Sequence, residues 1–299
     1  SGRIYLQNQS GEFNSYNQTA FENDALKEDV DAVFFDADSD NDLDLYVVSG
    51  GYSFPENAAE YQDRLYILKG FKNGSPIYEL SENALPRFHE MGACVEVADY
   101  DNDGDQDLFV GTRAVPGKYG LAAPSHLLQN DGNGQFKDVT ARTAPHMGSL
   151  GMVTDAAWLD YDNDNDLDLA VVGKWMPIVL FKNNGTNLER LNNIPGLEKS
   201  EGWWNTIEAT DLNNDGYMDF IAGNWGLNSR FRTSKEQPLT LFMNDFGDNG
   251  NMEHIFAYHQ DDKLYPMALK SELIRQIPSL KKDHLSYTKF AEADLGDLF

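Results

Sequence analysis

The segment DYDNDGDQDLFVG, residues 99–111, places aspartate at every second position from Asp99 to Asp107 and then turns apolar. Carboxylates this close together repel one another and destabilise a compact chain unless something neutralises them. The apolar residues that follow, ending at Gly111, are typical of a short buried β-strand. An acidic loop that leads into a strand is therefore the unit to search for in the rest of the chain.

The same thirteen-residue pattern occurs four times, with start-to-start spacings of 63, 61 and 51 residues. The copies are DADSDNDLDLYVV from Asp36, DYDNDGDQDLFVG from Asp99, DYDNDNDLDLAVV from Asp160 and DLNNDGYMDFIAG from Asp211. Four copies at similar spacing indicate an internal repeat.

Each acidic loop is predicted to join two strands. Before the loop, apolar residues alternate with others, as where Val95 and Val97 flank Glu96, and this two-residue period is typical of a strand. Five further segments have the form strand, Gly-containing turn, strand, and their Asn-Gly and Asp-Gly pairs favour hairpins. One strand pair plus one hairpin makes a four-stranded unit of about 50–60 residues, the size of a propeller blade.

The predicted fold is all-β. It is a β-propeller with enough strands for about five four-stranded blades, followed by a short C-terminal helical segment. Five hairpins accompany only four acidic loops. Either the first hairpin completes the last blade and closes the ring, or the chain is part of a larger propeller. We assign residues 1–260 to the propeller repeats and 261–299 to a helical extension or insert of the same propeller.

Composition narrows the choice of partners. The chain has 299 residues, 41% of them hydrophobic, which is enough for a substantial core. Its net charge of -26 argues against nucleic acid or an anionic membrane surface as partner. No apolar run is long enough to span a bilayer, so we expect no membrane insertion. The single cysteine, Cys94, excludes an intrachain disulfide and is predicted to be a buried thiol.

The loops have the donor set of a calcium site. Counted from the first aspartate of each copy, positions 1, 3, 5 and 9 carry side-chain oxygens in all four copies. The predicted ligands are Asp36, Asp38, Asp40 and Asp44; Asp99, Asp101, Asp103 and Asp107; Asp160, Asp162, Asp164 and Asp168; and Asp211, Asn213, Asp215 and Asp219. Position 6 is always Gly or Asn, which accept the left-handed backbone of a sharp turn. Such oxygens suit Ca²⁺, whereas no His or Cys recurs to favour zinc, so we expect about four calcium ions.

Two alternatives to this interpretation are weaker. An EF-hand shares positions 1, 3, 5 and 6 but needs a bidentate Glu at position 12. Position 12 here is apolar and lies inside the predicted strands: Val47, Val110, Val171 and Ala222. Acidic turns that are merely solvated would not need oxygen at four fixed positions.

The repeat resembles the FG-GAP and VCBS repeats, the calcium-loop blades of integrin α-subunit propellers. The segments LLQNDGNGQFKDVT and DYDNDGDQDLFVG look like the cartilage-acidic-protein (ASPIC) type of these repeats. The tail from Leu264 also looks like this type, as found in the large bacterial VCBS proteins of that group. The resemblance covers roughly residues 4–260. It implies a calcium ligand from the main-chain carbonyl of position 7, which falls on Asp42, Asp105, Asp166 and Tyr217.

The hairpin DFGDNGNME, from Asp245, departs from the pattern because Gly247 occupies position 3. It is either a fifth calcium site that uses Asp245, Asn249 and Glu253 or a plain hairpin turn, and the missing acid favours the turn.

No constellation for catalysis recurs with the repeat. The six histidines are scattered, and the chain lacks a G-x-S-x-G elbow, a phosphate loop and an H-E-x-x-H motif. We therefore predict no catalytic residues, and no cofactor besides calcium. Trp203, Trp204 and Trp225, close to the fourth loop, either stack on sugars or pack in the core, and packing is the commoner role.

The sequence thus favours a non-enzymatic, calcium-stabilised propeller that acts as a binding or adhesion module. We expect it to be secreted, periplasmic or on the cell surface, where calcium is abundant enough to fill sites of modest affinity. Its protein or glycan ligand is not identified by the residues. The alternative is a carbohydrate-binding or carbohydrate-processing propeller that uses the three tryptophans.

Overall fold

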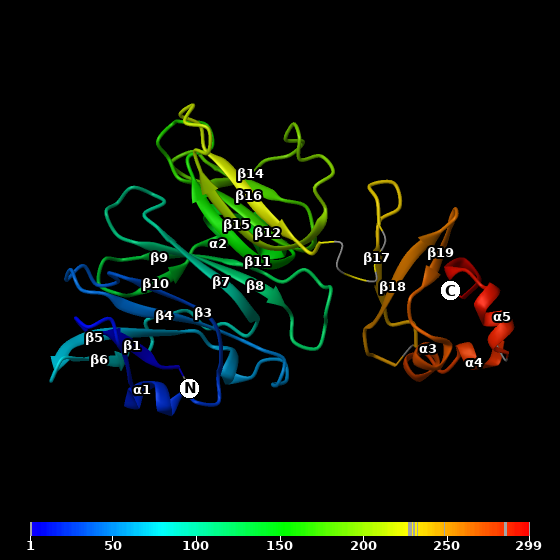
Figure 1. The fold of residues 1–299 in the computed structure, drawn as a ribbon, viewed down its shortest axis with the longest axis horizontal. Helices are drawn as coiled ribbons and strands as arrows, with labels where there is room; N and C mark the ends of the chain where they lie inside the picture. Colours follow the sequence, from blue (N-terminus) through cyan, green and yellow to red (C-terminus); the bar gives the residue numbers. More distant parts are fainter. Residues whose placement is uncertain are drawn as a thin grey trace. The chain divides into compact units, whose positions relative to one another are not determined.

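The structure is a computed structural model, and it describes residues 2–226, 229, 231, 233–247, 249–283 and 286–298. The chain is mostly β, with several antiparallel sheets and a few short helices (Figure 1). It forms two compact units, one of Ser1–Gly117 with Leu121–Asn224 and one of Lys118–Gly120 with Trp225–Phe299.

The first unit contains three modules of four antiparallel strands that are joined in chain order. Module 1 is β3 (Glu28–Phe35), β4 (Asp44–Gly50), β5 (Arg64–Lys72) and β6 (Ser75–Leu80); module 2 is β7 (Met91–Ala98), β8 (Asp107–Ala114), β9 (His126–Asn130) and β10 (Phe136–Asp138); module 3 is β11 (Met152–Leu159), β12 (Asp168–Met176), β13 (Val179–Asn183) and β14 (Leu188–Arg190). Each module consists of an acidic-loop strand pair and a hairpin, as predicted.

The fourth acidic loop joins β15 (Gly202–Thr210) to β16 (Asp219–Asn224). Besides β16, β15 pairs with the end of β12, where Lys174 lies opposite Trp203. The sheet ends at β16, because the next strands of the chain form a sheet of their own in the second unit. The four-stranded blade predicted for the fourth copy is therefore not found among the described residues.

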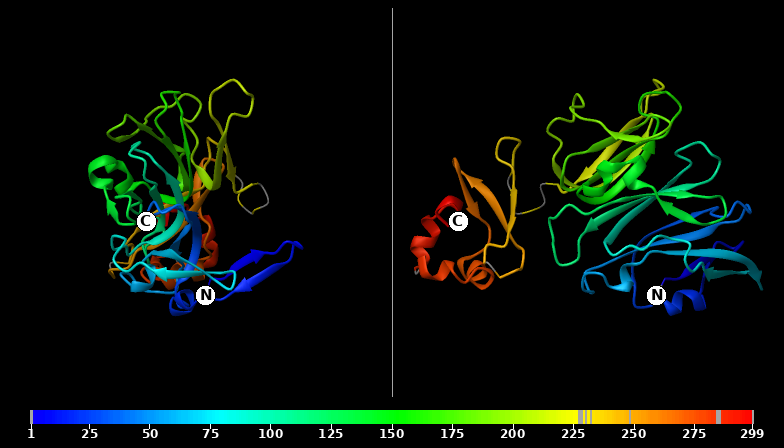
Figure 2. Two further views of the ribbon diagram at one scale, coloured as in Figure 1. Left: turned by 90° about the vertical axis from the view of Figure 1, so that its left-hand side faces the viewer. Right: turned by 180° about the vertical axis from the view of Figure 1, so that it is seen from behind.

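Apolar cores lie between neighbouring modules, whose sheets are stacked side by side (Figures 1 and 2). Module 1 packs on module 2 through Tyr46, Val48 and Leu108, and module 2 packs on module 3 through Phe109 and Val153. The approach is close: a Cβ added to Gly111 of β8 would lie 2.7 Å from Val153 Cγ1. Burying both faces of these strands explains why their sequences are almost continuously apolar.

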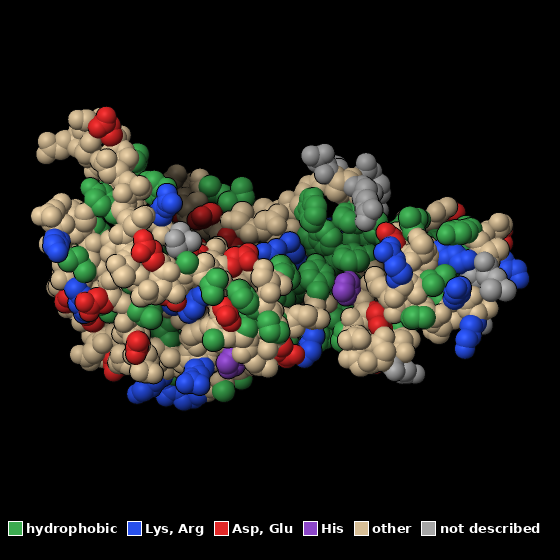
Figure 3. All heavy atoms as spheres, turned by 90° about the horizontal axis from the view of Figure 1, so that it is seen from below, with side chains coloured by type: hydrophobic (Ala, Val, Ile, Leu, Met, Phe, Trp, Pro, Cys, Tyr) green, Lys and Arg blue, Asp and Glu red, His purple; other side chains and the backbone are tan. Residues whose placement is uncertain are grey.

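The second unit has a three-stranded sheet followed by short helices. The strands are β17 (Thr240–Asn244), β18 (Glu253–Gln260) and β19 (Lys263–Pro266), and the helices are α3 (Lys270–Gln276), α4 (Leu280–Asp283), α5 (Tyr287–Glu292) and α6 (Leu295–Leu298). Ile255 and Leu273 are buried between sheet and helices. Figure 3 shows several Lys and Arg side chains over this helical end of the chain. The helical segment is present as predicted, and the domain boundary at residue 260 stays a prediction.

Several short elements have no counterpart in the predictions: α1 (Thr19–Asn23), η1 (Ala59–Tyr61), α2 (Thr140–Thr143) and η2 (Pro145–Ser149). The hairpin of β1 (Ile4–Gln7) and β2 (Phe13–Tyr16) forms a sheet by itself. Cys94 is a buried free thiol, as expected. In the part of the chain that the structure describes, no helix is both long and apolar enough to cross a membrane.

Candidate metal-binding loops

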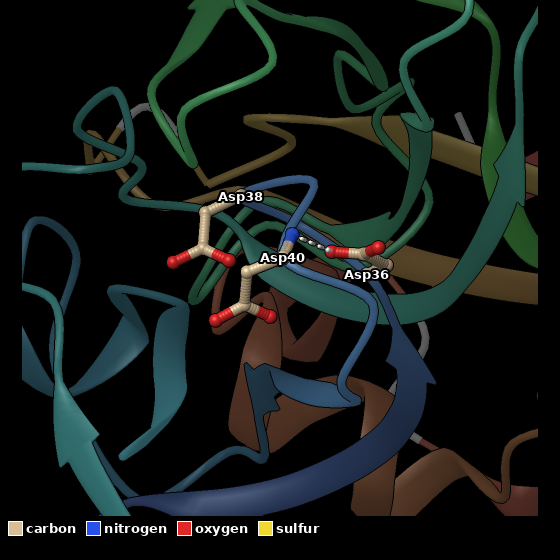
Figure 4. A group of neighbouring side chains, drawn as sticks. All are labelled: Asp36, Asp38 and Asp40. Atoms are coloured by element: carbon tan, nitrogen blue, oxygen red, sulfur yellow. Dashed lines mark hydrogen bonds between the residues drawn. The ribbon is translucent and has the colours of Figure 1, made fainter.

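The four acidic loops, numbered in chain order, share one backbone conformation built around position 1. In loop 2 the carboxylate of Asp99 accepts hydrogen bonds from the N–H groups of Asp103, at 3.1 Å, and Gly104, at 3.0 Å. The first aspartates of loops 1, 3 and 4 accept the equivalent pairs of N–H groups. Figure 4 shows the bond from the N–H of Asp40 to Asp36 in loop 1.

Two residues of each loop have a positive φ. In loop 2 these are Asn102, with φ 57°, and Gly104, with φ 98°. The position between them, Asp103, accepts the N–H of Asp105 at 3.0 Å. This tight turn explains why position 6 is always Gly or Asn, the residues that tolerate a left-handed backbone.

In three loops the turn brings carboxylates together. Three loops each contain a group of three aspartates, and one carboxylate oxygen from each aspartate lies within 4.8 Å of those from the other two. The groups are Asp36, Asp38 and Asp40 in loop 1, Asp99, Asp101 and Asp107 in loop 2, and Asp160, Asp162 and Asp168 in loop 3. Among the described residues loop 4 offers no such trio of acids, since Asn213 stands at position 3.

The aspartate at position 9 is buried in the three complete modules and anchors the loop to the third strand. Asp44 accepts the N–H of Leu68 at 2.8 Å, and Asp168 accepts the N–H of Asn183 at 2.7 Å. Asp107 accepts the N–H of Asn130 in the same way. Loop 4 has no third strand beside it in the first unit, and Asp219 is partly exposed with its Oδ2 accepting from Leu212 at 3.1 Å.

The electrostatics of loops 1 and 2 favour a bound cation. Burial raises the pKa of Asp44 to about 6, and burial together with the nearby Asp101 and Asp103 raises that of Asp107 to about 8. Three buried carboxylate oxygens of these loops accept no hydrogen bond, one each on Asp38, Asp42 and Asp101. Buried carboxylates without donors are costly unless a positive charge compensates them. The residues therefore fit a divalent cation that prefers oxygen.

The loops are also hydrogen-bonded to one another. Position 4 of one loop reaches the following loop: Ser39 Oγ donates to Asp105 at 3.4 Å, and Asn102 Nδ2 donates to Asp166 at 3.2 Å. Asn163 Nδ2 donates to the carbonyl of Gly216 at 3.0 Å. These links were not predicted from the sequence, although Ser or Asn at position 4 of every copy was a signal for them.

A second link uses an asparagine at the end of the third strand. Asn130 Nδ2 donates to the carbonyl of Ala37 in loop 1 at 2.9 Å, and Asn183 Nδ2 donates to that of Tyr100 in loop 2 at 2.7 Å. Both asparagines are buried. Each thus ties its module to the acidic loop of the preceding module.

The hairpin from Asp245 has the same internal bonding as the acidic loops. Asp245 accepts the N–H groups of Asn249, at 2.9 Å, and Gly250, at 2.8 Å. Glu253 is buried and accepts from the N–H of Gly247 and the side chain of Asn249. The turn is therefore built like the four acidic loops but without an acid at position 3, and calcium binding there stays a prediction.

Comparison with known proteins agrees with the repeat geometry. The family model described as FG-GAP-like repeat matches residues 99–171 and 160–222, which include loops 2, 3 and 4. Loops 2, 3 and 4 therefore lie in segments that are similar to FG-GAP-like repeats.

Its relatives include cartilage acidic protein 1 of Homo sapiens, 25% identical over 172 residues. That match covers 54% of this chain and 24% of the relative. The protein of the same name from Mus musculus is 24% identical over 188 residues, 60% of this chain and 27% of the relative. The chain thus spans about a quarter of the length of these curated relatives.

The main-chain ligand expected at position 7 of the FG-GAP-like repeats stays a prediction. The side chains at this position behave differently among the loops. Asp105 and Asp166 accept the links from the preceding loops, whereas the Tyr217 side chain is 59% exposed. An exposed phenol in loop 4 leaves the carbonyl as the ligand atom that this residue can offer.

The tryptophans beside the fourth repeat have different surroundings. Trp204 packs against the apolar core between module 3 and the β15–β16 pair, and its Nε1 donates to the carbonyl of Ser200 at 2.8 Å. Trp203 meets the ring of Trp175 edge-on at 4.8 Å. Trp225 is 49% exposed, with Phe231 6.2 Å away. Core packing therefore accounts for Trp204, as the sequence analysis favoured.

The strands that lead into the four acidic loops (β3, β7, β11 and β15) carry a second set of acids. Burial raises the pKa of Glu96 in β7 to about 8, and the charges of Asp155, Asp31 and Glu208 add to this shift. Asp155 accepts the N–H of Ile207 at 2.9 Å, so it is tied to the next repeat. Among these carboxylates Glu96 is therefore protonated much more readily than an ordinary glutamate.

Proposed function

We propose that the FG-GAP-like repeats bind calcium through the acidic loops and that the ions hold the repeats together. The observation that carries this proposal is the convergence of carboxylate oxygens within 4.8 Å in three loops of identical backbone bonding. Positions 1, 3, 5 and 9 supply side-chain oxygens, and position 7 supplies a carbonyl. This hard oxygen set suits Ca²⁺ better than zinc or other thiophilic ions.

Calcium in these loops would act as a structural staple. A metal that binds only the folded state adds about 2.7 kcal/mol of stability per site at a hundredfold excess over Kd. The hydrogen bonds between successive loops pass that stabilisation to neighbouring modules. We propose that the modules are blades of a β-propeller, because each sheet buries its faces against the next through a shared core.

We further propose that the chain is a non-enzymatic binding or adhesion module that works outside the cell or in the periplasm. The acidic side chains are committed to the metal, so they are not assigned to catalysis. Millimolar calcium in those compartments would fill loops of modest affinity. The FG-GAP-like repeats and the similarity to cartilage acidic protein 1 support this role.

The test is thermal unfolding of the full chain in excess EDTA and in millimolar Ca²⁺. Calcium should raise Tm by about 5 °C or more, since each kcal/mol is worth about 2–4 °C in a chain of this size. Millimolar Mg²⁺ should replace calcium poorly, because Mg²⁺ demands stricter octahedral geometry. Identical melting curves in EDTA and calcium would refute the proposal. Asp103→Ala, which removes a ligand from loop 2, should reduce the gain.

A carbohydrate ligand is a second candidate, favoured by the half-exposed indole of Trp225. A glycan array screened in calcium tests it. Reproducible binding that is lost in Trp225→Ala but kept in Trp204→Phe would support a sugar site at Trp225. Absence of binding would leave a protein ligand as the favoured partner.

A further inference from the structure

The residue that faces the acidic loop from the third strand differs among the modules. The strand register places Ile67 of β5, Gln129 of β9 and Lys182 of β13 at the same position. Each lies one residue before the N–H group that the position 9 aspartate accepts. The three side chains are apolar, neutral polar and cationic, so the modules supply a natural comparison.

In module 2 this residue orients a predicted calcium ligand without bringing a charge. Gln129 Nε2 donates to Asp101 Oδ2 at 2.6 Å. Its Oε1 accepts from Arg142 at 3.4 Å, so the amide stands between that guanidinium and the loop. The second oxygen of Asp101, Oδ1, is buried and accepts no hydrogen bond. Loop 2 therefore keeps a carboxylate oxygen that can turn to a metal.

In module 3 the same position places an ammonium group among the predicted ligands. Lys182 Nζ pairs with Asp162 at position 3 and lies 3.3 Å from Asp164 at position 5. Asp162 and Asp164 are exposed, whereas Asp38 and Asp101 at position 3 of loops 1 and 2 each keep a buried carboxylate oxygen without a hydrogen bond. The positive charge of the lysine thus takes the electrostatic place that a metal would take.

Calcium and this ammonium cannot use the same oxygens at once. Calcium needs its oxygens at about 2.3–2.6 Å, and two positive charges at such separations repel strongly. Moving the lysine away costs its two ion pairs and still leaves a mobile positive charge near the ion. In loop 1 the equivalent Ile67 is buried and brings no charge. Lys69, two residues along β5, offsets part of the raised pKa of Asp38 through its field, whereas Lys182 forms ion pairs with its loop.

We propose that Lys182 is an internal cation that competes with calcium, so that loop 3 binds calcium more weakly than loops 1 and 2. The inference rests on the proposed calcium binding of the repeats. Lys182 lies outside the acidic loops, and by this inference it helps to set the order in which calcium fills them. At low calcium, Lys182 keeps loop 3 neutralised and folded, and loop 3 fills after loops 1 and 2.

The experiment is calorimetric titration of Ca²⁺ into the calcium-stripped full chain and three variants. Lys182→Gln, which copies module 2, should tighten one site about tenfold, and Gln129→Lys should weaken one site by a similar factor. Lys72→Gln changes net charge equally at an exposed site in β5 and should leave every affinity unchanged. Circular dichroism checks that each variant is folded. If Lys182→Gln does not fold, Lys182→Ile, which copies module 1, replaces it in the titration.

The outcomes separate this inference from the proposed function. If wild type takes up no calcium, both are wrong. If calcium binds but Lys182→Gln or Lys182→Ile binds it as wild type does, the proposed function stands and the competition by Lys182 is refuted. A gain in affinity that survives in the Asp160→Ala background, where loop 3 is disabled, also refutes it, because the effect would then come from another loop.

Discussion

Modules 1 to 3 and the β15–β16 strand pair contain the same acidic loop in different surroundings. The internal hydrogen bonds of loop 3 and loop 4 are equivalent, from the N–H groups that position 1 accepts to the turn at position 6. Position 9 differs: Asp168 is buried against a third strand, whereas Asp219 is partly exposed. The loop conformation is thus local, and the burial of its last ligand depends on the completed sheet.

The largest difference should come from removing that last aspartate. Asp168→Ala leaves the N–H group of the buried Asn183 without an acceptor and also removes the part-buried bond from the N–H group of Tyr161, at a cost of about 2–4 kcal/mol. Asp219→Ala loses one longer bond at a partly exposed site and should cost about 1 kcal/mol or less. Urea unfolding in EDTA measures both without any contribution from calcium. Equal losses would show that the third strand does not distinguish the two loops.

A smaller difference in the pH dependence of stability is expected between Glu96 of β7 and Glu208 of β15, the strands that lead into loops 2 and 4. The folded-state pKa of Glu96, about 8, lies above its ordinary value of 4.5, so its stabilising contribution is complete below pH 4.5 and is lost as the pH rises through 8. We expect a loss of about 1–3 kcal/mol over that range, reduced by solvent screening.

Glu96→Gln should therefore flatten the fall of the free energy of unfolding between pH 5 and pH 9. Glu208→Gln should flatten it less, because Glu208 occupies the same repeat position but is exposed, and its charge adds less to the shift of Glu96 than burial does. Urea unfolding at a series of pH values in EDTA provides the measurement. If Glu96→Gln leaves the pH dependence unchanged, that dependence comes from other titratable groups and the prediction is wrong.

The smallest effect is expected at position 6, where the complete modules and the strand pair agree. Gly216 has φ 86° with open space where a Cβ would lie, and Asn165 occupies the same place with φ 71°. Gly216→Asn should change stability by less than about 1 kcal/mol, whereas Gly216→Val should cost about 1–2 kcal/mol through backbone strain. Thermal unfolding in EDTA distinguishes them. Equal stability of the two variants would contradict the requirement for a left-handed turn.

The sequence was sufficient to predict the structural features that depend on contacts between residues close together in the chain. Aspartate at position 1 and Gly or Asn at position 6 define a turn whose bonds span four or five residues, so the loops and their flanking strands could be predicted. The grouping of strands into modules 1 to 3 followed from the Asn-Gly and Asp-Gly hairpins.

Contacts between residues far apart in the chain could not be predicted in this way. Asn130 binds a carbonyl 93 residues away, and β15 pairs with the end of β12 through a bulged register that no periodicity reveals. The pairing of Lys182 with loop 3 depends on strand register as well. The helices α1 and α2 have only five and four residues, too few to show a helical period.

The hydrogen bonds that lead from Ser39, Asn102 and Asn163 into the following loops make the repeats a one-dimensional series of nearest neighbours. In such a series the free energy of each unit depends on its own contacts and on those with the units beside it, as in an Ising chain. Ordering one loop changes the bonding partners of the next loop only, so cooperativity decays with distance along the row. A destabilising substitution in the central module should therefore weaken the modules on both sides of it, whereas one in an end module should weaken a single neighbour.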